Sequence, residues 1–256
     1  MARPDSRALD ALRPVEMTPG FHRLSEGSVL YRAGATVVLC TASIDDKVPS
    51  FLEGQNKGWL TAEYQMHPRA NPRRQDRDGR GKPPSGRTQE IQRLVGRALR
   101  AAVDLDKIGS RTITIDCDVL EADGGTRTAS ITGGYVALAL AIAKLTKSGA
   151  LKQRVLRERV AATSVGCLDL PGKDASELAL DLVYLEDSKA RVDLNVVATA
   201  EGKIVEVQGT AEGEPVERKQ VDAMIDLALR GIATLCAVQK DALANAGVDL
   251  ATLTRI

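Results

Sequence analysis

The fold is decided around residues 121–130, which read Glu121-Ala-Asp-Gly-Gly-Thr-Arg-Thr-Ala-Ser130. Residues 111–119 before them alternate polar and apolar side chains, and this pattern predicts a β-strand. Residues 131–145 after them are almost wholly apolar and predict a buried helix. The two glycines permit a tight turn and a close approach of the backbone to a ligand. The stretch therefore predicts a strand, a glycine turn and a helix in succession.

A glycine turn that opens a helix predicts an anion site. The first turn of a helix offers free backbone N–H groups and the positive end of the helix dipole. Arg127 adds a forked cation suited to phosphate, and Thr126, Thr128 and Ser130 add hydroxyl donors. On its own, such a segment could equally be a structural turn.

The bulk composition indicates a globular protein. The 256 residues are 43% hydrophobic and only 3% aromatic, so the core must consist of Val, Leu, Ile and Ala. So few aromatic side chains argue against broad single-strand binding by base stacking. No apolar run approaches the roughly 18 residues of a membrane span, and residues 1–7 lack the apolar stretch of a signal peptide. We expect a cytoplasmic protein that does not enter the membrane.

The four cysteines and two histidines are too dispersed for a structural zinc site. No Cys-x-x-Cys pair occurs, so the cysteines are expected to be small buried hydrophobic residues. Sequence motifs for a nucleophilic serine elbow, a triphosphate-binding loop and a dinucleotide-binding turn do not occur either. Neither His22 nor His67 stands beside a candidate nucleophile, which argues against a hydrolytic triad.

Charge is divided along the chain although the net charge is only +1. Residues 67–100 carry ten Lys/Arg against three Asp/Glu, and residues 169–226 carry fourteen Asp/Glu against six Lys/Arg. This division favours a basic segment for a polyanion and an acidic segment that could hold a metal ion. Two solvated surfaces remain the alternative.

Elsewhere the pattern predicts a mixed α+β fold, one compact unit with two lobes over residues 1–243 and a C-terminal tail over 244–256. Residues 67–86 have no apolar periodicity and predict a long exposed loop. The remaining predicted elements are strands at 28–32, 36–44, 159–168, 178–185, 191–199 and 203–208, and helices at 87–103 and 217–245.

Three groups of charged residues are candidates for chemistry. Arg87 stands at a predicted helix start, where a cation is unfavourable unless an anion arrives there. Glu186-Asp187 and Asp193 flank a predicted turn at 187–190 and could hold Mg²⁺, and two carboxylates this close would raise the pKa of one of them. A flexible basic strip suits contacts to a phosphate backbone and comprises Arg69, Arg73, Arg74, Arg77 and Arg80. Each group taken alone could be plain surface.

Five stretches resemble the ribonuclease PH family. They are residues 3–7, 58–64, 85–100, 116–133 and 206–215, and the resemblance as a whole runs from about Arg3 to about Leu243. It implies a ribosomal protein S5 domain 2-like α+β fold. It also implies a phosphate-dependent 3′→5′ exoribonuclease that trims tRNA precursors, releases nucleoside diphosphates and assembles as a homohexamer, a trimer of dimers.

The resemblance assigns roles to individual residues. Arg87 and the trio Gly125, Thr126 and Arg127 match the family's phosphate-binding positions. Asp187 and Asp193 match the carboxylates assigned to metal binding, with Mg²⁺ as the ion, and to acid catalysis. The tRNA-gripping positions of the family fall on Arg69, Arg73, Arg74 and Arg77.

The sequence departs from the related polynucleotide phosphorylases after the second aspartate. They carry a lysine two residues after the second aspartate, where Asn195 stands here. Two other functions remain open: an RNA-binding ring subunit without activity, and a metal-dependent hydrolase that would release monophosphates.

Overall fold

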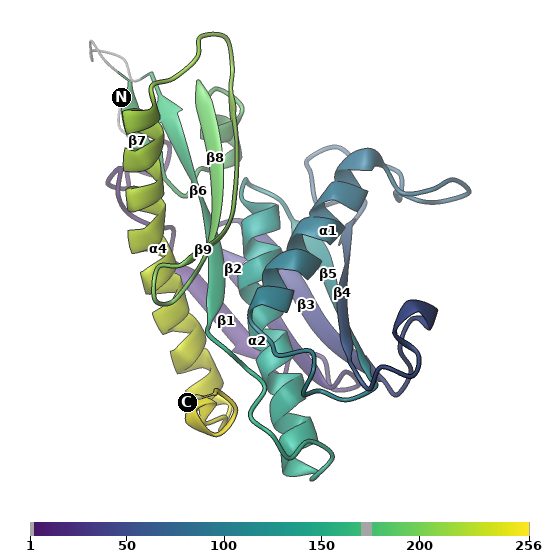
Figure 1. Cartoon of the computed structure of the whole chain (residues 1–256). Helices are drawn as coiled ribbons and strands as arrows, with labels where there is room; N and C mark the ends of the chain where they lie inside the picture. The colour runs from purple at the N-terminus through teal and green to yellow at the C-terminus, as the bar shows by residue number, and fades with distance from the viewer. Residues whose placement is uncertain (1–2, 170–175, 256) are drawn as a thin grey trace.

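The computed structural model describes residues 3–169 and 176–255. Within these ranges nine strands form two sheets that are accompanied by four α-helices (Figure 1). The strands of the first sheet lie in the order β1-β2-β3-β5-β4, and only the β4–β5 pair is parallel. The second sheet has the order β7-β6-β8-β9 and is antiparallel throughout. The predicted α+β class is confirmed.

The first sheet consists of β1 (Val15–Pro19), β2 (Gly27–Ala33), β3 (Thr36–Asp45), β4 (Trp59–Met66) and β5 (Thr112–Glu121). The second consists of β6 (Val160–Leu168), β7 (Glu177–Leu180), β8 (Val192–Thr199) and β9 (Ile204–Ala211). The helices are α1 (Gly86–Ala101), α2 (Thr126–Lys147), α3 (Tyr184–Asp187) and α4 (Arg218–Asn245), with short 3₁₀ turns at Ser50–Leu52 and Leu250–Thr252.

Helix α2 joins the two sheets. It packs on β2 and β3 of the first sheet and on β6 of the second, and α4 covers the second sheet along β6 and β8 (Figure 1). Fourteen residues of α2 are buried, from Thr128 to Ile142, so its start is held firmly between the sheets. The predicted aliphatic core is confirmed, and all four cysteines are buried.

The C-terminal residues pack on the hydrophobic core that the first sheet forms with α1 and α2. Leu253 is buried there, and Leu156 pairs with Thr254 as an isolated bridge. Residues beyond α4 therefore contribute to the fold.

Two boundary predictions are wrong, and two strands are missed. The buried helix begins at Thr126, five residues before the expected 131, because the glycine turn is only two residues long. The strand expected at 178–185 ends at Leu180, since Asp181 adopts a positive φ of 56° and the chain then turns into α3. The pattern also did not predict β1 and β4.

Helix α2 has the length and hydropathy of a membrane span, with a mean hydropathy of 1.4 over an 18-residue window, contrary to the expectation that no run would qualify. However, 78% of that window is buried inside the protein. A buried core helix passes the same test of composition as a membrane span.

Candidate active site

The glycine turn between β5 and α2 is closed tightly against a second segment. Gly124 and Gly125 have φ of 76° and 66°, a region that glycine adopts without steric cost. A Cβ on Gly124 would lie 2.5 Å from the carbonyl oxygen of Leu182 and 2.8 Å from the nitrogen of Tyr184. The backbone N–H of Tyr184 also donates to Asp123 Oδ1 over 3.2 Å. The turn therefore touches the segment that enters α3.

The hydroxyls at the start of α2 have divided roles. Thr128 Oγ1 donates to the carbonyl of Gly125 at 2.9 Å, and Ser130 Oγ donates to the carbonyl of Thr126 at 2.9 Å. The prediction that these two hydroxyls serve an anion is therefore wrong, because they are used within the helix. Thr126 Oγ1 instead lies 2.9 Å from the hydroxyl of Tyr64 on β4.

Arg127 lies where three elements meet. Its side chain is only 18% exposed, and its Nη1 donates to Gln208 Oε1 of β9 at 3.2 Å and to Glu90 Oε1 of α1 at 3.4 Å. The Gly125 N-cap has no side chain to cap the first N–H groups of α2. A forked cation thus stands beside free backbone donors, as an anion site requires.

The positive charges of Arg127 and Arg87 act on both Asp187 and Asp193. Burial and the charge of Asp187 raise the pKa of Asp193 to about 6, while Arg127, the amide of Asn195 and Arg87 oppose the shift. Burial also raises the pKa of Asp187 against the opposing charges of Arg127 and Arg87. The pKa rise expected for one carboxylate is therefore found at both, and it is larger at Asp193.

The structure thus brings together the predicted residues Arg87, Gly125, Thr126, Arg127, Asp187 and Asp193 from α1, α2, α3 and β8. Arg87 is exposed in the first turn of α1. Asn195 donates from Nδ2 to Asp193 Oδ2 at 3.2 Å, at the position where the resemblance to polynucleotide phosphorylases would lead to a lysine. The asparagine therefore supplies a hydrogen bond where a cation is missing.

Glu186 does not belong to the proposed metal ligands. Its carboxylate accepts two hydrogen bonds of 2.8 Å from Arg3, and the side chain is 5% exposed. The expectation that Glu186 could share a metal ion with Asp187 is therefore wrong, because its oxygens are occupied by a buried arginine.

The donor set fits Mg²⁺ only with help from the substrate. Among residues 3–169 and 176–255, no group of three or more His, Cys, Asp or Glu side chains could hold a metal ion. Mg²⁺ commonly binds through one or two carboxylates together with phosphate oxygens and water. Asp187 and Asp193 provide the two carboxylates, so the pair suits Mg²⁺ and does not resemble a zinc or calcium cage.

The predicted basic loop has no helix or strand from residue 67 to residue 85, and Gly86 already begins α1 (Figure 1). Its arginines Arg69, Arg73, Arg74 and Arg77 are exposed, as predicted. Only Arg77 of these four lines the pocket of about 590 Å³ that also contains Arg87. Arg74 pairs with Asp76 at 3.0 Å. The structure therefore places one of the four predicted RNA-binding arginines in the same pocket as Arg87.

Asp78 anchors this loop to α1. Its carboxylate accepts hydrogen bonds from Thr88 Oγ1 at 2.6 Å, from Ser85 Oγ at 2.7 Å and from the N–H of Ser85 at 2.9 Å. Hydrogen bonds from Thr88 and Ser85 lower the pKa of Asp78 to about 2. The contact fixes the loop at the helix turn that carries Arg87.

Sequence reasoning missed Tyr64 and Asp78. Ser85 is the N-cap of α1, and Asp78 binds it from seven residues earlier. Capping patterns in a sequence cover only the residues next to the helix start, so they do not reveal Asp78. Tyr64 lies in residues 58–64, which resemble the family but carry no pattern that predicts a strand.

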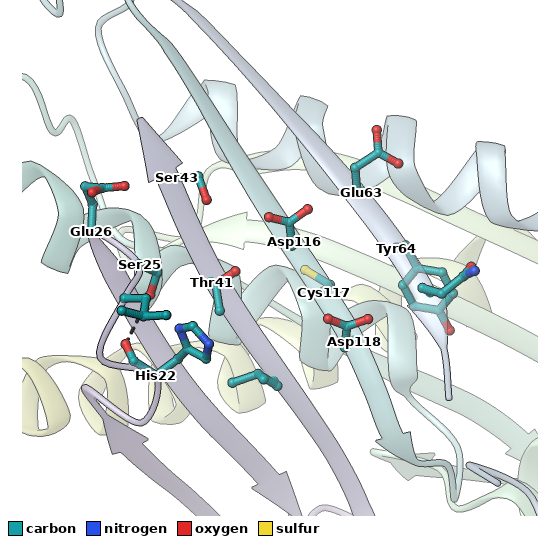
Figure 2. Close-up of a pocket in the computed structure, with 13 residues that line it drawn as sticks. His22, Ser25, Glu26, Thr41, Ser43, Glu63, Tyr64, Asp116, Cys117 and Asp118 are labelled. Atoms are coloured by element: carbon teal, nitrogen blue, oxygen red, sulfur yellow. Dashed lines mark hydrogen bonds between the residues drawn. The ribbon is translucent and has the colours of Figure 1, made fainter. Parts of the chain in front are cut away.

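The outer face of the first sheet carries a separate, acidic pocket of about 440 Å³. Figure 2 shows Glu63, Asp116 and Asp118 along it, from β4 and β5. Burial raises the pKa of all three, with neighbouring carboxylates adding to the rise for Glu63 and Asp116. Carboxylates that repel one another do not suit a phosphate backbone, so this face is unsuited to RNA.

Two sheets joined by a buried helix define an α+β protein, with arginines and carboxylates meeting in a candidate site at the start of that helix. Family models identify the family: "3′ exoribonuclease family, domain 1" matches residues 11–144, and "3′ exoribonuclease family, domain 2" matches residues 158–231. The chain belongs to this phosphorolytic 3′ exoribonuclease family, that of ribonuclease PH.

Solved structures agree on the fold. Rice (Oryza sativa) Rrp46 is 17% identical, with a TM-score of 0.73 over 94% of this chain and 100% of that chain. The Archaeoglobus fulgidus exosome with RNA bound to the active site is 22% identical, with a TM-score of 0.73 over 91% of each chain. An archaeal exosome core is 20% identical, with a TM-score of 0.69 over 93% of this chain and 91% of that chain. These matches show a ribosomal protein S5 domain 2-like fold.

Proposed function

We propose that this protein is a phosphate-dependent 3′→5′ exoribonuclease that trims the 3′ ends of tRNA precursors and releases nucleoside diphosphates. The reverse reaction adds nucleotides from diphosphates. The observation that carries the proposal is the shared electrostatic environment of Arg87, Arg127, Asp187 and Asp193 at the start of α2. A site for RNA cleavage by phosphate must hold two phosphates, and this one combines cations with carboxylates suited to a metal.

The nucleophile in this mechanism is inorganic phosphate. It is already an oxyanion, so no histidine is needed to deprotonate a hydroxyl. The difficulty is the repulsion between the attacking phosphate and the phosphodiester of the RNA. Arg87, Arg127 and the first N–H groups of α2 offset that repulsion and align the attacking oxygen.

The chemical step exchanges one phosphorus–oxygen bond for another. A phosphate oxygen attacks the phosphorus of the last phosphodiester, and the bond to the 3′-oxygen of the preceding nucleotide breaks. The products are a nucleoside 5′-diphosphate and an RNA shortened by one nucleotide.

The leaving 3′-oxygen takes a proton, and we propose Asp193 as its donor, because burial and the charge of Asp187 raise the pKa of Asp193 to about 6. Mg²⁺ bound by Asp187 and Asp193 would neutralise charge on the scissile phosphodiester.

The proposed partners follow from the basic loop and the solved relatives. Exposed arginines of residues 67–86 would grip the body of the tRNA precursor, and rRNA ends are further candidates. Relatives solved as exosome assemblies support a ring, for which we propose a homohexamer built as a trimer of dimers. We also propose a cytoplasmic location without contact with a membrane.

An RNA-binding ring subunit without activity is the main alternative. Such a subunit would have no use for a carboxylate pair held in the field of two arginines. The retention of Arg87, Arg127, Asp187 and Asp193 in one site therefore favours catalysis.

The deciding experiment uses a 3′-extended tRNA precursor with Mg²⁺, with and without inorganic phosphate. Phosphate-dependent release of nucleoside diphosphates is the expected result. Release of monophosphates without phosphate would show a hydrolase instead. Binding of the tRNA without shortening would show the inactive ring subunit.

A further inference from the structure

The N-terminal arm, residues 3–13, forms a buried ionic network that the proposed chemistry does not use. The side chains of Arg3 and Arg13 are only 1% and 3% exposed. Arg3 donates from Nε and Nη2 to the two carboxylate oxygens of Glu186, both at 2.8 Å. Arg13 forms a similar fork with Asp181, at 3.0 Å from Nε and 2.7 Å from Nη2.

The first of these forks holds α3 in place. Glu186 immediately precedes Asp187, and its Oε2 also accepts the N–H of Val183 at 3.1 Å. Helix α3 has only four residues, too few to be stable by itself. Its position, and with it that of Asp187, must therefore be set by tertiary contacts.

The second fork reaches the phosphate-binding turn. Arg13 Nη1 donates to the carbonyl of Asp123 at 2.7 Å, next to Gly124, while the same side chain holds Asp181. Asp181 is a non-glycine residue with a positive φ of 56°, a strained conformation that needs support from its surroundings. The arm thus contacts both segments whose separation defines the site.

Stability alone does not explain this arrangement. Replacing a buried ion pair with apolar residues is often neutral or stabilising, because desolvation offsets the attraction between the charges. Forked hydrogen bonds, however, fix orientation as well as distance. Both forks here end on the segment that carries Asp187 into the site.

We propose that the N-terminal arm is a positioning element, in which Arg3 acting through Glu186 and Arg13 acting through Asp181 set the place of Asp187 relative to the turn at Gly125 and Arg127. Its consequence for catalysis rests on the proposed function, whereas the positioning itself does not. Arg3 and Glu186 are positioning residues because neither is placed to touch the substrate.

The test compares Arg3→Lys and Glu186→Gln with the wild-type chain. Lysine keeps the positive charge of Arg3 but cannot form the fork, and glutamine keeps the shape of Glu186 without its charge. We expect kcat to fall on the order of 10-fold in each, as for other residues that orient a ligand through a neighbour. The KM for phosphate should not change, because Arg87 and Arg127 are held by α1 and α2. The double variant should lose no more than the worse single variant, since the two residues act as one unit.

The control is Asp10→Asn, which removes a charge from an exposed residue of the same arm. It should leave kcat unchanged. An unchanged kcat in Arg3→Lys and Glu186→Gln below their unfolding temperature would show a purely structural arm. Losses that add in the double variant would likewise overturn the proposal.

Amide hydrogen exchange separates this inference from the proposed function. Faster exchange over residues 182–190 in Arg3→Lys, with unchanged exchange over 86–90, is expected even if the wild-type chain releases no diphosphates. Uniformly faster exchange, or no change at 182–190, would overturn the positioning role. If Arg3→Lys does not fold, the isosteric Glu186→Gln gives the same two readings.

Discussion

At the scale of single residues, Arg127 has the most direct consequence for phosphate. It stands one residue inside α2, beside free N–H groups, and is held by Gln208 and Glu90. Arg127→Ala should raise the KM for phosphate about 10- to 100-fold, because a charge-assisted hydrogen bond contributes about 1.5–3 kcal/mol. Binding of tRNA should remain nearly intact, which filter binding would check.

The matched control for this prediction is Arg230→Ala, an exposed arginine on α4. It should alter neither the KM for phosphate nor tRNA binding. Equal losses of phosphate and tRNA affinity in Arg127→Ala would instead show that Arg127 holds α1, α2 and β9 together.

Asp181 gives a prediction about stability and pH. Burial disfavours its charge, but the hydrogen bonds and charge of Arg13 outweigh burial and lower the pKa of Asp181. A lowered folded-state pKa stabilises the fold above the unfolded-state value of about 3.9 and loses that contribution as the pH falls. Asp181→Asn, in which the new asparagine tolerates a positive φ, should cost about 3–5 kcal/mol near pH 7 because it leaves the buried charge of Arg13 without its carboxylate partner.

The measurement is urea unfolding of both proteins between pH 7 and pH 3. The difference in free energy of unfolding should narrow as the pH falls below about 4. A constant difference over that range would mean that the charge of Asp181 does not stabilise the fold.

At the scale of elements, the contact between the glycine turn and α3 decides how the site closes. Gly124→Ala imposes left-handed strain of about 1–2 kcal/mol and a clash with Leu182 that costs a further 1–3 kcal/mol. Gly149→Ala is a matched control, since Gly149 also has a φ of 76° but a Cβ added there would meet no atom within 4 Å. The unfolding temperature and kcat should both fall further in Gly124→Ala, and equal effects would exclude the close contact.

Asp78 makes the basic loop and α1 one unit. Asp78→Ala should raise the KM for phosphate severalfold and weaken RNA binding, because Ser85 and Thr88 lose the carboxylate that fixes the helix start carrying Arg87. Asp76→Ala is the control, since it removes the same charge from the same loop but breaks only the exposed pair with Arg74. An equal KM for phosphate in the two variants would show that Asp78 does not anchor the loop to α1.

The elements show what the sequence could and could not predict. Long segments with a clear period, such as the Ile91–Leu99 stripe of α1, were predicted within a few residues. The four-residue α3 was hidden in a strand-like stretch, because one turn is too short to display a helical period. Its place depends on Arg3, 183 residues from Glu186, and no local pattern records such a contact.

In the candidate site, too, local features could be predicted from the sequence and long-range contacts could not. Arg87, Gly125, Arg127, Asp187 and Asp193 could be chosen from local chemistry and from family resemblance. Their mutual electrostatic influence, and the pKa of about 6 at Asp193, required the fold to bring Asp193 near Arg127 and Asp187. The use of Thr128 and Ser130 within their own helix could not be read from residue type alone.

At the scale of the whole molecule, charge is separated between two regions. The basic loop carries exposed arginines beside Arg87, whereas the outer face of the first sheet gathers Glu63, Asp116 and Asp118 (Figure 2). A polyanion is attracted to the first region and repelled by the second. Under the proposed function, this separation of charge would turn the 3′ end of an RNA toward the start of α2.

Assembly belongs to the same scale. For the proposed homohexamer, native mass spectrometry should give a mass six times the 27.3 kDa of one chain. The mass of the assembly should also be measured for each loop variant. A change in assembly would remove the basic loops of neighbouring subunits and so alter RNA binding by itself.

The salt dependence of RNA affinity tests the orientation. Each phosphate contact on a single strand contributes about 0.7 to the slope of log K against log salt. Replacing Arg69, Arg73, Arg74 or Arg77 singly with glutamine should lower the slope by about that amount wherever the arginine contacts RNA, with the oligomer intact. Arg32→Gln, exposed on β2, removes the same charge and should leave the slope unchanged. If Arg32→Gln lowered the slope as much, affinity would follow net charge alone. An unchanged slope in all four loop variants would mean that the RNA follows another path, because arginines in contact with phosphates must release counterions.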